Sequence, residues 1–140
     1  MLRRNDRNLD NIPIGALGLI SLEGCEEMGS KVNDYLVKWR REDGHIHKND
    51  VAFSGYERDT YLVNAGVPRF GSGEAKGIIK ESVRGMDLYL MVDVCNYSLT
   101  YSLTGHTNHM SPDDHYQNLK RVIAAVAEKP PPQRDHAFLI

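Results

Sequence analysis

The chain has 140 residues, of which 41% are hydrophobic and 26% charged, the size and composition of one globular domain. The formal net charge is -2, and acidic and basic residues are mixed along the chain, which excludes the basic face typical of nucleic-acid-binding domains. No apolar run approaches the ~20 residues that a membrane span requires.

The N-terminus and the two cysteines indicate the cellular compartment. Residues 1–13 are mostly polar, lack the apolar core of a signal peptide, and are expected to form a flexible segment. Cys25 and Cys95 lie far apart and form neither a disulfide framework nor a CxxC metal clip. We therefore expect a reduced, cytoplasmic protein whose partners are neither nucleic acid nor membrane.

The first half of the chain predicts one strand and one long helix. Residues 16–21 (ALGLIS) read as a buried strand, and a helix is expected over about 24–41. Its apolar residues share one face, with acids in the first turn and bases in the last: Met28, Val32, Tyr35, Leu36 and Trp39, after Glu26 and Glu27 and before Lys38, Arg40 and Arg41. Asp43-Gly44 is expected to end this helix. Residues 42–59 are then expected to form a polar surface excursion, which could include a short strand near 51–53.

The second half predicts three strands, a loop and a helix. Strand-like runs cover 60–70, 75–79 and 88–94, and the last is apolar enough for a central strand covered on both faces. Residues 95–110 are expected to form a polar loop. Ser111-Pro112-Asp113-Asp114 then predicts a helix that stops at Lys129 before three prolines, and residues 137–140 would begin another strand. Strands alternating with helices predict one α/β domain over residues 14–140.

Two glycine-containing turns carry the most informative residues. Residues 69–74 (RFGSGE) predict a bend between two strands, with Phe70 and Glu74 at its tip, and a second turn presents Ser82 and Arg84. An exposed Phe beside a carboxylate could stack on a heterocycle and accept a hydrogen bond from its amine. The alternative is an ordinary hairpin with Phe70 in the core and Glu74 solvated, which spacing alone favours.

The order of these motifs resembles a known family. Arg-Phe-x-x-Gly-Glu (69–74), Ser-Val-Arg-Gly-x-Asp (82–87) and a hydrophobic strand are similar to the amino-terminal domain of ribose-phosphate pyrophosphokinases. Residues 18–29 and 108–125 are similar to the same domain in a divergent bacterial branch with longer loops. The resemblance covers about residues 14–128, with a loop insertion near 42–59.

This resemblance implies a phosphoribosyltransferase-like (type I) α/β domain, with a mainly parallel sheet flanked by helices plus a β-hairpin, in a homo-oligomer. The enzymes of the family transfer a diphosphoryl group from ATP to ribose 5-phosphate with Mg²⁺, which feeds nucleotide biosynthesis. By resemblance, Phe70 stacks on the adenine of ATP bound to a neighbouring subunit, and Ser72 and Glu74 help to position that base. The family usually has Asp or Asn where Ser72 stands. Ser82 and Arg84 match positions of its regulatory phosphate site.

The catalytic groups of the family are expected beyond this chain, whose residues 130–140 match the family poorly. These groups are an Arg-Gln loop over the phosphates, a metal-binding histidine, a catalytic lysine and an acidic ribose loop, so the chain alone is expected to be inactive. A non-catalytic regulatory or scaffolding relative is the main alternative. A free-standing nucleotide-binding module is a third, and it would bind ATP as a monomer.

Other chemistries have weaker support. Residues 71–77 resemble a phosphate-binding loop, but a strand is predicted after them instead of a helix. A dense group of potential metal ligands lies near the second helix, without a metal-binding motif and with two members assigned to capping: His106, His109, Asp113, Asp114 and His115. His45 and His47 are expected in a solvated loop, and Cys95 lacks an evident base. No metal ligand is therefore assigned.

Overall fold

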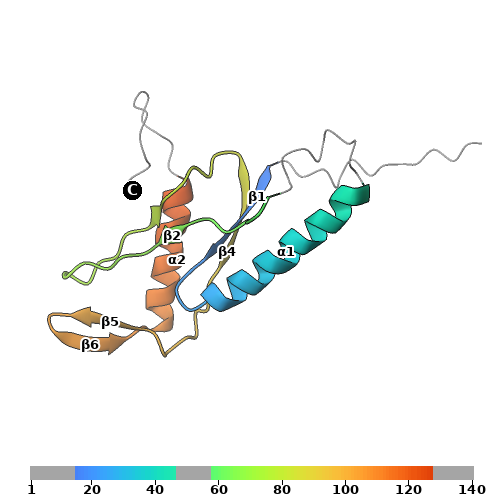
Figure 1. Ribbon diagram of the computed structural model, residues 1–140. Coiled ribbons are helices and arrows are strands. Elements are labelled where there is room, and N and C mark those ends of the chain that lie inside the picture. Colours follow the sequence, from blue (N-terminus) through green and yellow to red (C-terminus); the bar gives the residue numbers. More distant parts are fainter. Residues whose placement is uncertain (1–14, 47–57, 128–140) are drawn as a thin grey trace, which may run out of the picture.

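A computed structural model describes residues 15–46 and 58–127; for residues 43–46 it describes the backbone alone. The elements in chain order are β1 (Ala16–Ser21), α1 (Glu26–Ile46), β2 (Ala65–Gly66), β3 (Ile78–Ile79), β4 (Met86–Met91), β5 (Thr100–Leu103), β6 (His106–His109) and α2 (Pro112–Ala127). In Figure 1, β1 and β4 lie between the two helices, and two hairpins project to the left. Neither described helix combines the length and the apolar character needed to cross a membrane.

The centre of the domain is a parallel arrangement around β1. β4 pairs with β1 in parallel along its whole length. On the other edge, the Leu19 amide donates to the Tyr61 carbonyl at 2.8 Å and the Val63 amide donates to the Leu19 carbonyl at 2.9 Å. Residues 61–63 therefore run parallel to β1 as well, joined by a bridge between Leu19 and Leu62. The predicted α/β class, with parallel strands, flanking helices and a hairpin, is confirmed.

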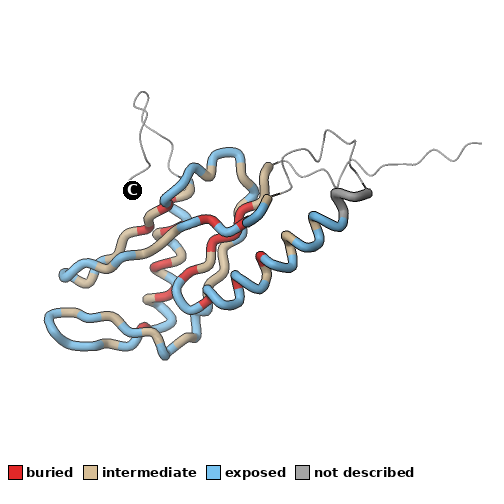
Figure 2. The backbone as a smooth tube through the Cα atoms, in the orientation of Figure 1, coloured by how far each residue is buried: buried red, intermediate tan, exposed pale blue. Residues whose placement is uncertain are grey.

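The two helices cover opposite faces of these strands because strand side chains alternate between faces. Ile20, Leu22 and Val63 point to α2, where they join the core cluster with Ile79, Val122 and Ala125. On the other face, the Cα of Gly29 in α1 lies against the Ser21 side chain so closely that a methyl group there would collide with it. The buried residues in Figure 2 accordingly gather along β1 and the inner side of α2.

The apolar face predicted for the first helix coincides only in part with the face that packs on the sheet, since Val32 and Leu36 are half-buried. Met28, Tyr35 and Trp39 are 62%, 59% and 57% exposed, while Cys25, Gly29 and Asn33 are buried. Two specific contacts select the buried face: Gly29 permits close approach to Ser21, and the Asn33 Oδ1 accepts a hydrogen bond from the Tyr61 amide at 2.8 Å. Close packing and one buried polar bond thus outweigh the simple apolar pattern.

The end of this helix also differs from the prediction. α1 continues to Ile46 through Asp43-Gly44, because a glycine weakens a helix without ending it. His45 therefore lies in a helix and not in a loop. His47 and the short strand near 51–53 lie outside the described residues.

β4 is not the doubly covered strand that its sequence suggests. Its burial alternates, with Asp87 exposed and Tyr89 64% exposed, while Leu88 and Leu90 pack against the core cluster. The reason is that α1 packs over β1, and the outer face of β4 stays open among the described residues.

The predicted polar loop 95–110 contains a third pair of strands. β5 and β6 form an antiparallel hairpin, with Tyr101 opposite Asn108. Its two-residue turn, Thr104-Gly105, has positive φ at both positions (50° and 83°), the geometry that matches the twist of a tight hairpin. Tyr97 stacks on His109 beside it, with ring centroids 4.4 Å apart.

The second helix begins where the sequence predicts. The Ser111 hydroxyl donates to Asp114 Oδ2 at 2.8 Å and accepts from the Asp114 amide at 3.2 Å, which completes a cap before Pro112. The predicted segment 1–13, the helix end at Lys129 and the strand over 137–140 lie outside the described residues.

Candidate functional site

The glycine-hinged bend is present as a hairpin with a short tip. β2 and β3 pair antiparallel, and a bridge between Arg69 and Ala75 carries the pairing to the tip. The Phe70 amide donates to the Glu74 carbonyl at 2.7 Å, and the Gly73 amide donates to the Phe70 carbonyl at 2.9 Å. Gly73 has φ 90°, a conformation that L side chains rarely adopt, so glycine suits this position.

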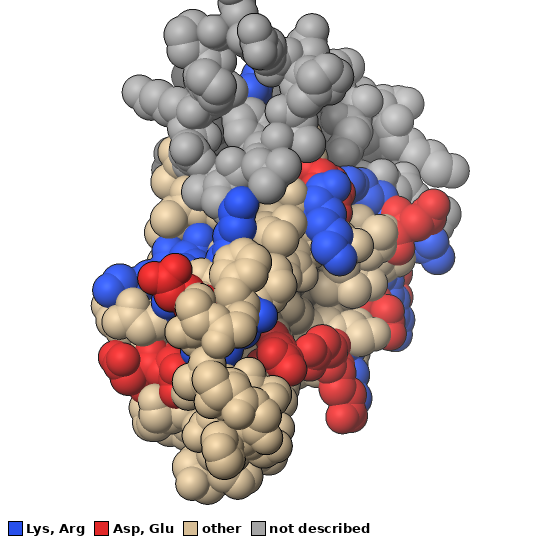
Figure 3. Space-filling model, turned by 90° about the vertical axis from the view of Figure 1, so that its left-hand side faces the viewer, with Lys and Arg blue, Asp and Glu red and all other residues tan. Residues whose placement is uncertain are grey.

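The tip presents its predicted binding residues to solvent. Phe70 is 51% exposed, and Ser72 and Glu74 are exposed too. The interpretation that placed Phe70 in the core is therefore wrong. On the face of the molecule toward which the hairpins project, acidic and basic side chains lie close together, and the lower end is free of both (Figure 3). That lower end is where β5 and β6 lie, and residues 94–112 contain no Lys, Arg, Asp or Glu.

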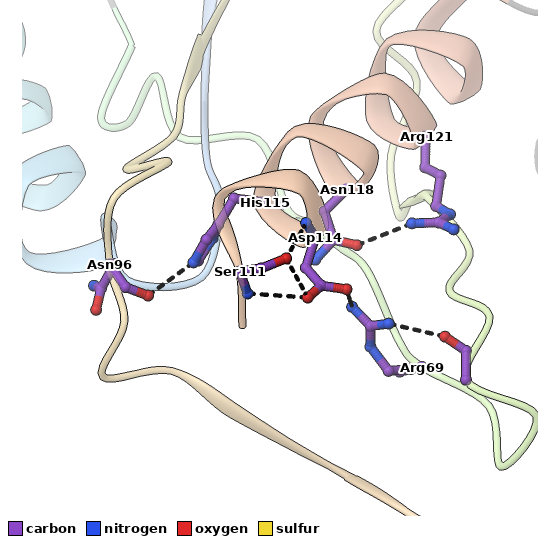
Figure 4. Close-up of polar contacts among 8 residues, drawn as sticks. Arg69, Asn96, Ser111, Asp114, His115, Asn118 and Arg121 are labelled. Atoms are coloured by element: carbon purple, nitrogen blue, oxygen red, sulfur yellow. Dashed lines mark hydrogen bonds and ion pairs between the residues drawn. The ribbon is translucent and has the colours of Figure 1, made fainter. Parts of the chain in front are cut away.

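Arg69, beside the exposed Phe70, faces inward and holds the base of the tip (Figure 4). Its Nη1 donates to the Gly73 carbonyl at 2.8 Å, and its Nη2 lies 3.5 Å from Asp114 Oδ1. The guanidinium carbon is 4.0 Å from the centroid of the Tyr101 ring, a cation–π contact. The Arg69 side chain is only 14% exposed. Sequence reasoning assigned no role to Arg69, because its partners lie on α2 and β5.

Asp114 joins this anchor to the start of α2. Its Oδ2 accepts from the Ser111 amide at 2.9 Å and from the Ser111 hydroxyl, while Oδ1 faces Arg69. Burial by itself raises the pKa of Asp114, but the hydrogen bonds from Ser111 and the charge of Arg69 outweigh it, so the pKa lies below its ordinary value. The carboxylate thus stays ionised at neutral pH and serves the helix cap and the hairpin together.

The second predicted turn lies apart from the tip. Ser82 and Arg84 are exposed in the segment that leads into β4, where Gly85 has φ 71°. The Asn64 amide donates to Glu81 Oε1 at 2.8 Å and ties this segment to the strand before β2. In Figure 1 the tip points to the left while this turn lies at the top, so the structure does not bring the two groups together.

Three of the five potential metal ligands near α2, His109, Asp114 and His115, have other partners. The ring Nδ1 of His109 lies 2.8 Å from the Tyr97 carbonyl, and the Nε2 of the buried His115 lies 2.8 Å from the Asn96 carbonyl. Asp114 is held by Ser111 and Arg69. Over residues 15–46 and 58–127, no three His, Cys, Asp or Glu side chains are grouped to hold a metal ion.

The other alternative sites also lack the expected geometry. Residues 71–77 lead into β3 and not into a helix, so they do not form a phosphate-binding loop. Cys25 is buried and Cys95 exposed, and both are free thiols. Burial raises the pKa of Cys25, and the Asp93 carboxylate raises it further, which disfavours a reactive thiolate. A surface depression lined by Arg41, Arg58, Asp59 and Thr60 lies by α1, away from the hairpin tip.

Comparison with known protein families shows to which family the chain belongs. The family model of the N-terminal domain of ribose phosphate pyrophosphokinase matches residues 17–130. The chain belongs to this family. The match includes both the 69–74 tip and the 82–87 turn, so the predicted relationship to the ribose-phosphate pyrophosphokinases, a family of transferases, is confirmed. No curated protein and no solved structure matches the chain.

Proposed function

We propose that this domain serves a ribose-phosphate pyrophosphokinase by holding the adenine of ATP with its hairpin tip. The observation that carries the proposal is the solvent-exposed Phe70 at the end of an anchored hairpin, where its backbone pairs with that of the exposed Glu74. An aromatic ring facing solvent offers a stacking surface for a purine, worth roughly 1–3 kcal/mol. Glu74 and Ser72 provide oxygen atoms that can accept hydrogen bonds from the exocyclic amine of the base.

The ATP in this proposal is bound on a neighbouring subunit of a homo-oligomer. The tip projects away from the body of the domain, so a ligand stacked on Phe70 needs a second surface to enclose its phosphates (Figure 1). Binding sites enclose most of their ligand, and an isolated hairpin tip offers one side only. The phosphate-binding surface is therefore supplied by the neighbour, together with Mg²⁺.

The reaction that the domain supports is diphosphoryl transfer. The anomeric hydroxyl of ribose 5-phosphate attacks the β-phosphorus of ATP, the bond to the α-phosphate oxygen breaks, and AMP leaves. Such transfers depend on positioning and on cations that stabilise developing charge. In this proposal the tip contributes positioning of the adenine, and the catalytic groups lie outside this chain. Ser82 and Arg84, on their separate turn, form part of a regulatory phosphate site, for which a guanidinium is well suited. The proposed location is the cytoplasm.

Calorimetric titration of ATP into the assembled full-length protein tests the proposal. Phe70→Ala is expected to weaken ATP binding roughly 5- to 150-fold, the loss of one stacking contact. Tyr89→Ala is the matched control, because Tyr89 is another exposed aromatic residue, on β4 (64% exposed), and it should leave the affinity unchanged.

Two results would contradict the proposal. The first is an unchanged ATP affinity for Phe70→Ala together with a large fall in melting temperature, which would make the ring structural. The second is tight ATP binding by the 140-residue monomer, which would favour a free-standing nucleotide-binding module over a site shared between subunits.

A further inference from the structure

Two consecutive residues of the hairpin reverse the usual rule of burial. The charged Arg69 side chain is 14% exposed, whereas the apolar Phe70 is 51% exposed. Moving a guanidinium out of water costs free energy unless it gains hydrogen-bonding or ionic partners. A phenyl ring left in water does not gain the favourable free energy of apolar burial. The burial of the Arg69 guanidinium is tolerated because three partners within the domain compensate for its lost hydration.

The first contact closes the tip. Arg69 stands at one end of the tip, and its Nη1 donates to the carbonyl of Gly73, four residues later. A hydrogen bond from a charged donor is stronger than a neutral one. It braces the glycine with positive φ, which would otherwise sample many conformations. The chain between Arg69 and Gly73, which includes Phe70 and Ser72, is thereby held at both ends.

The other two contacts fix the closed tip to the body of the domain. Nη2 faces Asp114 in the first turn of α2, and the guanidinium lies over the Tyr101 ring of β5. Asp114 is itself held by Ser111 (Figure 4). One side chain therefore joins the tip to two elements that are more than thirty residues away along the chain.

We infer that Arg69 is a positioning residue that sets the direction in which Phe70 and Glu74 face the adenine. This inference rests on the proposed function. Arg69 does not touch the nucleotide, because its side chain is engaged within the domain; it acts by holding the tip in its binding conformation before the ligand arrives. A preformed contact surface binds more tightly, since less conformational entropy is lost on binding.

Amide hydrogen exchange on the 140-residue chain tests the positioning without any nucleotide. In Arg69→Met, which keeps an apolar stem, exchange of the Phe70 and Gly73 amides is expected to accelerate about tenfold or more, with β1 unchanged. Arg69→Lys should restore part of the protection, because one ammonium group can replace one of the contacts. Arg121→Met is the matched control, because within residues 15–46 and 58–127 the Arg121 guanidinium bonds only to Asn118, on the same helix. Unchanged tip exchange in Arg69→Met would overturn the inference.

A double-mutant cycle in the assembled full-length protein then tests whether positioning matters for ATP. Arg69→Met should weaken ATP binding about tenfold, and adding Arg69→Met to Phe70→Ala should cause a clearly smaller further loss, because the Phe70 contact is already gone and only Glu74 remains to be displaced. Additive losses would overturn the inference, since they would indicate that Arg69 contacts the ligand itself. If Phe70→Ala has no effect, the proposed function fails, while the exchange experiment still decides whether Arg69 orders the tip.

Discussion

The base of the β2–β3 hairpin is packed into the core, whereas its tip is exposed to solvent. At the base, Ile79 belongs to the core cluster, and Gly77 lies so close to the backbone of α2 at Arg121 that no side chain fits between them. At the tip, Phe70 is exposed and a Cβ added at Gly71 would meet nothing within 4 Å. The difference teaches that one hairpin can combine residues that stabilise the fold with exposed residues available for the proposed contact with ATP, so substitutions should separate the two properties.

The largest effect is expected from the core residue at the base. Ile79→Ala should destabilise the domain by about 2–5 kcal/mol, because it removes apolar burial and leaves a cavity beside Val122 of α2. Urea unfolding followed by far-ultraviolet circular dichroism measures this change. A loss below about 1 kcal/mol would mean that the base is not an integral part of the core.

A smaller loss is expected from the glycine that contacts α2. Gly77→Ala would press a methyl group against the Arg121 carbonyl, and backbone cannot yield cheaply, so a cost of about 1–3 kcal/mol is expected. Gly71→Ala, at the open tip of the same hairpin, should change stability by less than about 0.5 kcal/mol. Equal melting temperatures for the two variants would remove the distinction between base and tip.

The ion pair between Arg69 at the hairpin tip and Asp114 of α2 gives a pH-dependent prediction. The pKa of Asp114 is lowered in the folded protein, so its ionised form stabilises the fold above the unfolded pKa of about 3.8, and this contribution is lost as pH falls through the folded pKa. Asp114→Asn should therefore cost about 1 kcal/mol at pH 7, through weaker hydrogen bonds from Ser111 and the lost ion pair with Arg69, and the difference in stability from the unmodified protein should disappear on acidification below pH 4. Urea midpoints over pH 2–7 follow this difference. A difference that does not change with pH would show that the charge of Asp114 does not contribute.

The smallest effect on stability is expected at the tip itself. Phe70→Ala should change the free energy of unfolding by less than about 0.5 kcal/mol, because half of the side chain already faces water. Thermal unfolding by calorimetry checks this value, with Ile79→Ala as the reference for the base. A loss comparable with that of Ile79→Ala would show that the ring packs on the domain.

Local patterns predicted those parts of the fold that depend on neighbouring residues. The β1 strand, the α2 cap at Ser111 and the bend at residues 69–74 each rest on short-range chemistry, such as capping, apolar runs and glycine turns, and each is present. The β5–β6 hairpin was missed because its strands contain few apolar residues. Its signal was the Thr104-Gly105 turn after the run 100–103, in which Tyr101 and Leu103 alternate with small polar residues.

Features that depend on distant residues could not be read from the sequence. Tyr35 and Trp39 have the spacing of a buried face, yet α1 turns them to solvent because Gly29 and Asn33 make closer contacts with the sheet. The anchoring role of Arg69 could not be predicted for the same reason, since its partner Asp114 is 45 positions away. The exposure of Phe70 could not be read from the sequence either. Spacing alone favoured a core position for its ring, and only the packing of the whole domain showed that the ring is exposed.

Photoaffinity labelling tests the central claim most directly. The assembled full-length protein is irradiated with 2-azido-ATP, whose reactive group sits on the adenine ring, and the labelled peptides are identified by mass spectrometry. The account predicts label on residues 70–76, lost in Phe70→Ala and suppressed by excess ATP. Label absent from this peptide, or confined to the depression around Arg41 and Arg58, would contradict it.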